Sequence, residues 1–212
     1  PLPRHSGNRV LWDHLTVPNH AKRCPASVLY NIKLVLPERL RIPGFTTLHD
    51  LMYFPQPDKY RWREYLLGDS LYMRFFVRRT VRRAPLTHCV SKYTKEDAED
   101  LFPLIDSDRF RVIHNGVDVE RWRPGEWNEE DRALWRGLVE RGVRPPFVFY
   151  SGGMSRRKNL RVLATAFERF QRRHPEYQLV VTGGQKPTMD DPRLKRALYR
   201  IPLGKYLRLG TV

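Results

Sequence analysis

The stretch FVFYSGGMSRRKNLRVLATAFERF, residues 147–170, changes its hydrophobic period halfway along. It opens with four consecutive apolar residues, Phe147 to Tyr150, which is the pattern of a strand buried in a sheet. Two glycines, Gly152 and Gly153, follow, and after Lys158 the apolar residues recur with helical spacing. The sequence therefore predicts a strand, a glycine turn and a helix in immediate succession.

A turn of this kind can bind phosphate. In an open α/β sheet, ligands bind where the carboxyl ends of the strands lead into helices. The first helical turn attracts anions, glycines allow an anion to approach the backbone, and a lysine adds a mobile charge. Gly152, Gly153 and Lys158 are thus candidates for a diphosphate site, although neither GxGxxG nor GxxxxGK[ST] is present. From these residues alone, a turn without a ligand is an equally good interpretation.

The rest of the chain repeats the alternation of strands and helices. Strands are expected at residues 45–48, 86–90, 111–114, 147–150 and 178–182, with short strands in SVLYNI and YLRLG. Helices are expected in NRVLWDHLTV (ending at Pro18), at 62–83, in KYTKEDAEDLF (capped by Ser91), in NEEDRALWRGLVERG, at 159–173 and in DPRLKRALYR. Such alternation indicates an α/β fold with parallel sheets flanked by helices.

A domain boundary is expected near Asp118. Residues 119–146 are charged and rich in tryptophan, contain no apolar strand, and have prolines near both ends. We interpret them as a linker between two parts, residues 1–118 and residues 147–212. The five main strands should be parallel and divided between two sheets.

The charge is strongly positive. The chain has 212 residues and a formal net charge of +16, from 39 Lys+Arg against 23 Asp+Glu. Nine of these cations are lysines, so 39 − 9 leaves 30 arginines. This balance suits acidic partners such as nucleic acid, anionic lipid or phosphorylated substrates. Because the arginines are spread over the whole chain, solvated helix faces are an interpretation of equal weight.

The cysteine positions and the lengths of the apolar runs bear on the cellular compartment of the protein. Cys24 and Cys89 lie far apart and have no metal-ligand spacing, and Cys89 in THCV is expected to be a buried thiol. The sequence contains no run of about 18 apolar residues that could span a bilayer. These features favour a reducing, cytoplasmic setting.

Four segments together resemble one family of enzymes. VSKYTKEDAEDLF, RVIHNGVD, FVFYSGGMSRRKNL…LATAFERF and YQLVVTGG, in this order and spacing, are similar to glycosyltransferase family 4, and TTLHDL resembles its His-Asp loop. The resemblance covers residues 44–212. It implies a GT-B fold of two Rossmann-like domains: the first on the acceptor side, and the second, here residues 147–212, binding the donor. It also implies a mannosyltransferase-like transfer of a hexose from a nucleotide sugar, with retention and with no metal or other cofactor.

The resemblance also assigns site residues. His49 corresponds to the histidine at the donor sugar, with Asp50 beside it, and we treat both as candidate catalytic residues. The candidate donor-binding residues are Gly152, Gly153, Arg157, Lys158, Asn159, Gly183 and Gly184. Many members have an arginine where Gly153 stands, so Arg156 or Arg157 could take over its contact with the phosphates.

The pair of glutamates typical of the family is not identified in this chain. Glu168 and Glu176 have the required spacing of eight. We reject them because Glu168 lies inside a helix, where we expect it to face solvent, and Glu176 follows Pro175, where that helix ends. We therefore expect an internal fragment of a longer enzyme, inactive by itself.

The expected partners are a nucleotide sugar and a sugar or lipid-linked acceptor. The arginines of helix 62–83 suggest peripheral attachment to an anionic membrane on its inner face. Nucleic acid is not an expected partner, because no short segment interleaves basic and aromatic residues. Two alternatives remain open: a basic nucleic-acid-binding module and a non-catalytic α/β scaffold.

Overall fold

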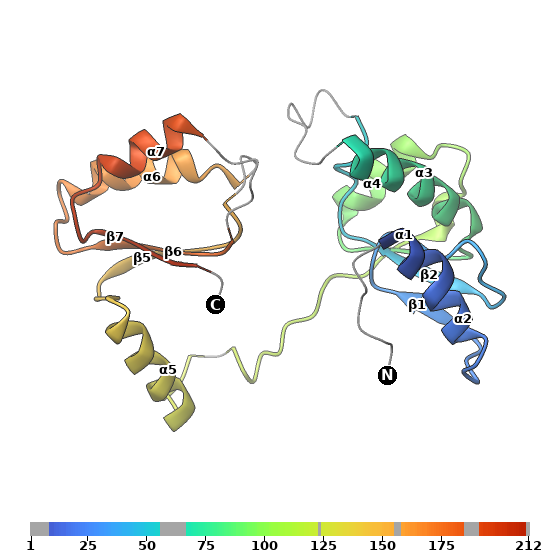
Figure 1. Cartoon of the computed structure of the whole chain (residues 1–212), viewed down its shortest axis with the longest axis horizontal. Helices are drawn as coiled ribbons and strands as arrows, with labels where there is room; N and C mark the ends of the chain where they lie inside the picture. The colour runs from blue at the N-terminus through green and yellow to red at the C-terminus, as the bar shows by residue number, and fades with distance from the viewer. Residues whose placement is uncertain (1–8, 56–66, 123, 155–157, 185–190, 211–212) are drawn as a thin grey trace. The chain divides into compact units, whose positions relative to one another are not determined.

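Two compact units make up the chain in a computed structural model (Figure 1), which describes residues 9–55, 67–122, 124–154, 158–184 and 191–210. The first unit is Pro1–Trp122 and the second is Arg123–Val212. One unit contains a four-stranded sheet and the other a three-stranded sheet, and every pair of neighbouring strands is parallel. The prediction of parallel strands divided between two sheets is therefore confirmed.

The strands of the first unit follow one another in sequence order. They are β1 (Leu29–Asn31), β2 (Gly44–Leu48), β3 (Thr87–Cys89) and β4 (Phe110–Val112), in the order β1-β2-β3-β4. Helix α3 (Leu67–Arg83) connects β2 to β3, and helix α4 (Lys92–Leu101) followed by the short turn η2 (Ser107–Arg109) connects β3 to β4. The part of the predicted helix 62–83 before Leu67 lies outside the described residues.

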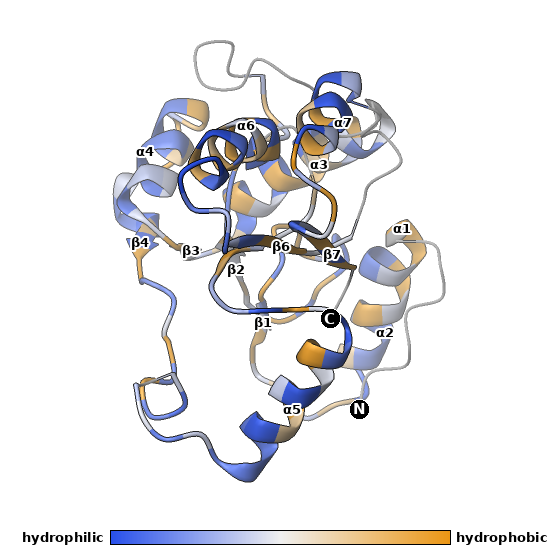
Figure 2. Ribbon diagram, turned by 90° about the vertical axis from the view of Figure 1, so that its left-hand side faces the viewer, coloured by the Kyte–Doolittle hydropathy of each residue, from blue (hydrophilic) through white to orange (hydrophobic). Residues whose placement is uncertain are grey.

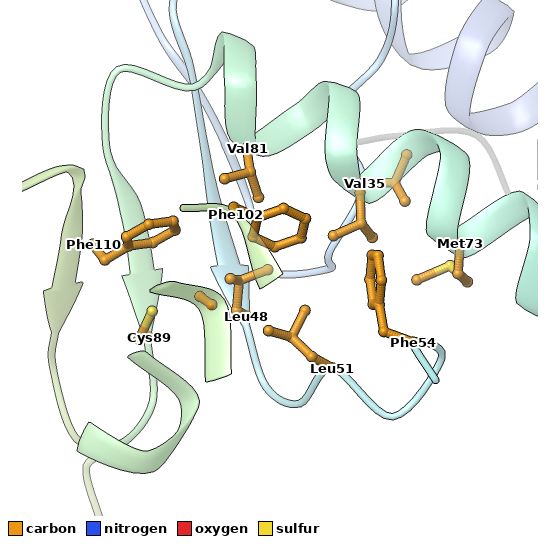
Figure 3. Packing of buried hydrophobic residues seen from close by; sticks show 11 residues of the cluster. Val35, Leu48, Leu51, Phe54, Met73, Val81, Cys89, Phe102 and Phe110 are labelled. Carbon is orange, nitrogen blue, oxygen red and sulfur yellow. The ribbon is translucent and has the colours of Figure 1, made fainter. Parts of the chain in front are cut away.

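The core of the first unit lies between its sheet and helices α3 and α4 (Figure 3). Met73, Val77 and Val81 recur every four residues along α3 and are fully buried. They pack in one cluster with Leu48 at the end of β2. Because one face of α3 is fixed against the sheet, the loops at the ends of β2 and β3 have defined positions.

The N-terminal helical segment differs from the prediction. It consists of α1 (Arg9–Leu11), the π-helical turn η1 (Trp12–Thr16) and α2 (Val17–Ala21). Pro18 does not end the helix but lies in the first turn of α2, where its missing N–H is not needed. The Val17 N–H bonds to the Trp12 carbonyl in a π-turn, and this wider turn accommodates the Pro18 ring.

The second unit is a three-layer sandwich. Its strands are β5 (Phe147–Ser151), β6 (Gln178–Thr182) and β7 (Tyr206–Gly210), in the order β5-β6-β7. Helices α6 (Leu160–Gln171) and α7 (Pro192–Tyr199) cover one face of this sheet, and α5 (Glu129–Glu140) lies on the other side (Figure 1). Hydrophobic clusters on the two faces hold the three layers together.

Helix α5 belongs to the second unit and not to a linker. Trp135 and Leu138 of α5 pack against Val180 and Leu209 of the sheet. The sequence predicted the helix but placed it in a linker of residues 119–146, because its charged surface hides two half-buried contact residues. The structure instead assigns residues 123–146 to the second unit.

Side chains cap helices α4, α5 and α7. The Ser91 Oγ accepts a hydrogen bond from the Thr94 N–H (3.1 Å), which confirms the predicted cap of α4. Asn128 and Asp131 form a capping box on α5, and Asp191 caps α7. In Figure 2, helices α4, α6 and α7 alternate between hydrophilic and hydrophobic residues, as expected for helices that cover one face of a sheet.

Several arginines bind backbone carbonyls. The Arg109 guanidinium donates to three carbonyls at the end of α3, those of Val81, Arg82 and Ala84. Similar contacts join Arg74 to Tyr53, Arg83 to Pro37, Arg141 to Leu209, and Arg144 to Val139 and Val143. Part of the positive charge is therefore used inside the fold, an explanation that the sequence did not suggest.

No helix in the described part of the chain is both long enough and apolar enough to cross a membrane.

Candidate functional site

Each strand of the second sheet ends on a glycine with a left-handed backbone. Gly152 follows β5 with φ 148°, Gly183 follows β6 with φ 114°, and Gly210 is the last residue of β7 with φ 74°. Since the strands are parallel, the three glycines lie along the same edge of the sheet. We call Gly152, Gly183 and Gly210 the glycine edge. Because glycine adopts such angles at little cost, this edge presents main chain where other residues would present side chains.

Hydrogen bonds between main-chain atoms hold the glycine edge together. The Gly152 N–H donates to the Thr182 carbonyl (3.3 Å), and the Met154 N–H donates to the Gly184 carbonyl (3.1 Å). The Gly183 N–H donates to the Gly210 carbonyl (2.6 Å). The turns after the three strands are therefore joined into one surface.

Gly183 and Gly153 differ in the space around them. A Cβ atom at Gly183 would lie 2.5 Å from the carbonyl carbon of Gly152, so no side chain fits there. At Gly153 a Cβ would meet only the Gly184 carbonyl oxygen, at 3.8 Å, which is ordinary contact. Gly153 therefore has room for a Cβ atom, whereas Gly183 does not.

The N-terminus of α6 follows directly from the turn after β5. Lys158 and Asn159 precede the first helical residue, Leu160, and both are exposed. Asn159 has a left-handed backbone (φ 49°, ψ 37°), a conformation that asparagine tolerates better than most residues. The Val162 N–H donates to the Asn159 carbonyl (2.9 Å), and the Leu160 and Arg161 N–H groups before it lie at the positive end of the helix. With the Lys158 ammonium beside them, they can hold an anionic group.

The structure thus brings most of the predicted donor-binding residues to one edge of the second sheet. Gly152, Gly153, Gly183, Gly184, Lys158 and Asn159 all follow β5 or β6 at their carboxyl ends. Arg157, and with it Arg156, lies outside the described residues. Gly210 was missed by the sequence analysis. Its signal was present in YLRLG, where a glycine follows an apolar strand just as Gly183 does.

His49 and Asp50 lie in the first unit, immediately after β2. The exposed His49 faces the Ile32 carbonyl with Nε2 at 2.8 Å, so Nε2 carries a proton and a neutral ring has its free lone pair on Nδ1. The Asp50 Oδ1 accepts a hydrogen bond from the Met52 N–H (3.3 Å), which shapes the following turn. The backbone orients both side chains, leaving His49 Nδ1 available to a ligand.

A second histidine, His88, ties the strands of the first sheet together. Its Nε2 donates to the Ile113 carbonyl (2.6 Å), and its Nδ1 lies 3.1 Å from both the Tyr30 and the Thr47 hydroxyl. These partners come from β1, from β2 and from the segment after β4. These contacts could not be predicted from the sequence, because the partners are far from His88 along the chain.

The rejected glutamate pair lies away from the glycine edge. Glu168 is within α6 and pairs with Arg172 at 2.8 Å, with 13% of its side chain exposed, so it does not face open solvent as expected. Glu176 lies just before β6, near His174, at the opposite end of the strand from Gly183. Their positions support leaving the pair out of the site.

The described side chains provide neither a reactive thiol at Cys89 nor a metal-binding cluster. Burial raises the pKa of the Cys89 thiol to about 11, so Cys89 is protonated at neutral pH and is not a nucleophile. Among the described residues, no group of three or more His, Cys, Asp or Glu side chains is placed to hold a metal ion.

A match to a protein-family model shows the family of this chain. The model of Glycosyltransferase Family 4 matches residues 2–121, which is more than half of the sequence. This chain belongs to glycosyltransferase family 4. The match includes His49, Asp50 and all four strands of the first sheet.

Two curated proteins are similar in sequence to this family 4 chain. An alpha-maltose-1-phosphate synthase of Mycolicibacterium smegmatis is 32% identical over 150 residues, and one of Mycobacterium tuberculosis is 30% identical over the same length. The alignment covers 69% of this chain but 36% of each relative. The chain therefore spans about a third of the length of the curated relatives it matches.

Solved structures show the fold. WaaG, a glycosyltransferase involved in lipopolysaccharide biosynthesis, is similar with a TM-score of 0.64 and 16% identity, over 100% of this chain and 56% of WaaG. A glycosyltransferase from Rickettsia africae gives a TM-score of 0.59 at 16% identity, over 99% and 54% of the two chains. The family 4 chain therefore has the GT-B type of α/β fold.

Proposed function

We propose that the protein to which this chain belongs transfers a sugar from a nucleotide-sugar donor to an acceptor. The glycine edge and the N-terminus of α6 bind the donor diphosphate. The observation that carries the proposal is the presence of three left-handed glycines in front of a helix N-terminus that bears Lys158. Main-chain N–H groups and an ammonium group are suited to a diphosphate, whose charge increases as the sugar leaves.

The kind of ligand is supported by structural neighbours. Staphylococcus aureus MnaA was solved with UDP, and an Escherichia coli trehalose-6-phosphate protein was solved with UDP-2-fluoro glucose. Both share the fold with this chain at low identity, 9% and 13%. We therefore choose UDP as the first probe of the glycine edge and leave the base and the sugar open.

Finer features of the reaction follow from the family resemblance. We propose a hexosyl, mannosyltransferase-like transfer with retention of configuration and without a metal, in a cytoplasmic setting, to a sugar or lipid-linked acceptor. In this proposal His49, which the Ile32 carbonyl orients, lies at the donor sugar, and Asp50 lies beside it. Activity that persists in EDTA and an α-linked product from an α-linked donor are the expected results.

The positive charge of the chain does not by itself favour nucleic-acid binding over this proposal. Five of the described arginines bind backbone carbonyls, and Arg79 forms a bidentate pair with Glu38 at 2.8 Å. These cations are already engaged within the fold. A nucleic-acid binder would show a steep dependence of affinity on salt, whereas a donor site should prefer one nucleotide at fixed salt.

A peripheral contact with anionic membrane remains part of the proposal, on a smaller surface than the sequence suggested. Arg74, Arg79 and Arg83 of α3 are engaged within the unit. On the outer side of the same helix, Leu71 and Phe75 are each 56% exposed. An apolar stripe beside the remaining cations is suited to a membrane surface. Sedimentation with anionic but not with neutral vesicles is expected, and Phe75→Ser should weaken it.

The central proposal is tested by titrating the 212-residue chain with nucleotides while its amide resonances are recorded. UDP, GDP, ADP and pyrophosphate are the probes, and at least one should shift the amides of Gly152, Gly183 and Leu160. Lys158→Ala should reduce the shifts at the same ligand concentration. Shifts confined to other surfaces would contradict the assignment of the glycine edge.

A further inference from the structure

Strand β7 contains a bulge beside the glycine edge. The Leu179 N–H bonds to the Lys205 carbonyl (2.8 Å), so in a regular parallel ladder the Gly183 N–H, four residues on, would bond to the Leu209 carbonyl. The observed acceptor is the Gly210 carbonyl, and the register shifts between Val181 and Thr182. Leu209 is therefore the extra residue, and its carbonyl stands outside the ladder.

The displaced carbonyl is bound from another element. Arg141, the residue that ends α5, donates from Nη2 to the Leu209 carbonyl oxygen. The Leu209 side chain is buried in a cluster with Val143 and Val180. A carbonyl in such surroundings is costly without a donor, and a charged donor makes a stronger hydrogen bond than a neutral one. Arg141 therefore stabilises the bulge by binding the carbonyl that the ladder does not use.

The bulge decides which residue closes the glycine edge. With it, Gly210 lies opposite Thr182, and the Gly210 carbonyl binds the Gly183 N–H at 2.6 Å. Without it, the regular register would place Leu209 opposite Thr182, so a residue with a leucine side chain would take the position that Gly210 holds. Bulges are frequent next to functional sites because they redirect residues in this way.

We propose that Arg141 is a positioning residue for the diphosphate-binding edge: it holds the bulge at Leu209 and thereby fixes Gly210 and Gly183. The proposal rests on the proposed function in so far as this edge binds the donor. Arg141 acts on this edge through its hydrogen bond to one carbonyl of β7, that of Leu209.

Arg144 provides a matched control. It lies in the same turn after α5, and its Nη1 donates to the carbonyls of Val139 (2.5 Å) and Val143 (2.8 Å). Arg144→Ala removes the same charge from the same end of α5 but no hydrogen bond to β7. A difference between the two variants therefore reports on the bulge and not on α5 or on net charge.

The experiment compares Arg141→Ala, Arg141→Lys and Arg144→Ala in the 212-residue chain. Amide hydrogen exchange of Gly183 is measured without ligand, and UDP is then titrated. Loss of a charge-assisted hydrogen bond should raise Gly183 exchange in Arg141→Ala about tenfold and weaken UDP binding about tenfold. Arg141→Lys should restore part of both effects, and Arg144→Ala should change each by less than about twofold.

Two failures are distinguishable. Gly183 exchange that is the same in Arg141→Ala and in the unchanged chain overturns the role of Arg141. Absence of any shift at the glycine edge of the unchanged chain with all four probes, UDP, GDP, ADP and pyrophosphate, overturns the proposed function instead. If Arg141→Ala does not fold, Arg141→Lys and Arg141→Gln take its place. The proposal is contradicted if both variants keep the Gly183 exchange rate and the UDP affinity of the unchanged chain.

Discussion

The carboxyl edges of the two sheets are built differently. At the edge of the first sheet, His49, Asp50 and Ser91 each make a hydrogen bond to the main chain, which orients their side chains. At the edge of the second sheet, the strands end on Gly152, Gly183 and Gly210, and the main chain itself forms the surface. The first unit thus offers side-chain chemistry, and the second offers a main-chain surface next to the N-terminus of α6.

This difference predicts how each edge responds to substitution. An oriented side chain can be exchanged for another that keeps its hydrogen bond, so the fold survives while the chemistry changes. A main-chain surface has no such option, because any Cβ atom changes the shape of the surface itself. Substitutions should therefore separate stability from function in the first unit and couple them in the second.

The largest effect is expected for Gly183→Ala. The methyl group would overlap the Gly152 carbonyl, and the backbone has φ 114°, so we expect a loss of about 3–5 kcal/mol in the stability of the second unit. Gly153→Ala is the control, since its methyl would meet one oxygen at 3.8 Å. Chemical denaturation of both variants checks this. Equal midpoints would show that the edge tolerates side chains after all.

Lys158→Ala should leave the fold intact and reduce turnover. In the longer enzyme, loss of one stabiliser of the charge on the leaving diphosphate should lower kcat by roughly 10²–10³-fold. Lys205 is a matched lysine at the other end of the second sheet, where its Nζ reaches the Glu176 carbonyl at 3.4 Å. Lys205→Ala should keep full turnover. Similar losses in both variants would contradict a role specific to Lys158.

His49 allows stability and function to be separated. His49→Ala removes the hydrogen bond to the Ile32 carbonyl and should cost about 1 kcal/mol in stability of the first unit. His49→Gln can keep a donor to that carbonyl, so it should unfold at the midpoint of the unchanged chain and still lose activity in the longer enzyme. Full activity of His49→Gln would show that the imidazole is not required.

Two buried threonines of the first unit test how much a hydrogen bond to a buried hydroxyl contributes to stability. The Thr87 hydroxyl is buried with no hydrogen-bond partner among the described residues, whereas the Thr80 hydroxyl accepts a hydrogen bond from the Leu36 N–H at 2.8 Å. Thr87→Val should raise the stability by up to about 1 kcal/mol, and Thr80→Val should lower it by about 1 kcal/mol. Changes of the same sign, measured by thermal unfolding, would contradict this distinction.

The smallest effect is a dependence of stability on pH that is confined to the first unit. Burial lowers the pKa of His14 below 6.5, against the opposing fields of Asp13 and Glu38 and with a contribution from Arg83. His14 also contacts the Tyr72 hydroxyl at 3.1 Å. Because the folded state favours the neutral ring, its contribution is complete above pH 6.5 and decreases as the pH falls below that value.

The measurement is the unfolding midpoint of each unit between pH 7.5 and pH 5. His14 is partly solvated, so the loss should stay below about 1 kcal/mol. His14→Phe, which can keep the ring contact with Phe76, should flatten the profile of the first unit. The second unit contains one of the seven histidines, His174, and its midpoint should change less. A steeper change in the second unit would be inconsistent with this assignment.

The sequence predicted the features that depend on local pattern. Continuous apolar runs located the strands, and Ser91 located the start of α4, because both signals lie within a few residues. The glycine turns after β5 and β6 were found for the same reason. The sheet to which α5 belongs was not predicted, since its contact residues are two half-buried side chains on a charged helix.

Features that depend on distant contacts were not predictable. The bulge in β7 is held by a hydrogen bond between residues 68 positions apart, and His88 bonds to Tyr30 across 58 positions. Pro18 was misplaced because a π-turn, which has no sequence signature, precedes it. Such features are set by which elements pack together, and one sequence contains no direct record of that.

The binding of carbonyls by arginine has a practical consequence for protein engineering. A chain with a net charge of +16 invites replacement of surface cations to improve its behaviour in solution. Exposed residues such as Arg161 and Arg193 can be changed at little cost. Arg109 cannot, because its Nη2 binds three carbonyls at the end of α3, and those carbonyls would lose their donor. A charge-reduced variant should therefore be chosen by hydrogen-bond partners and not by exposure alone.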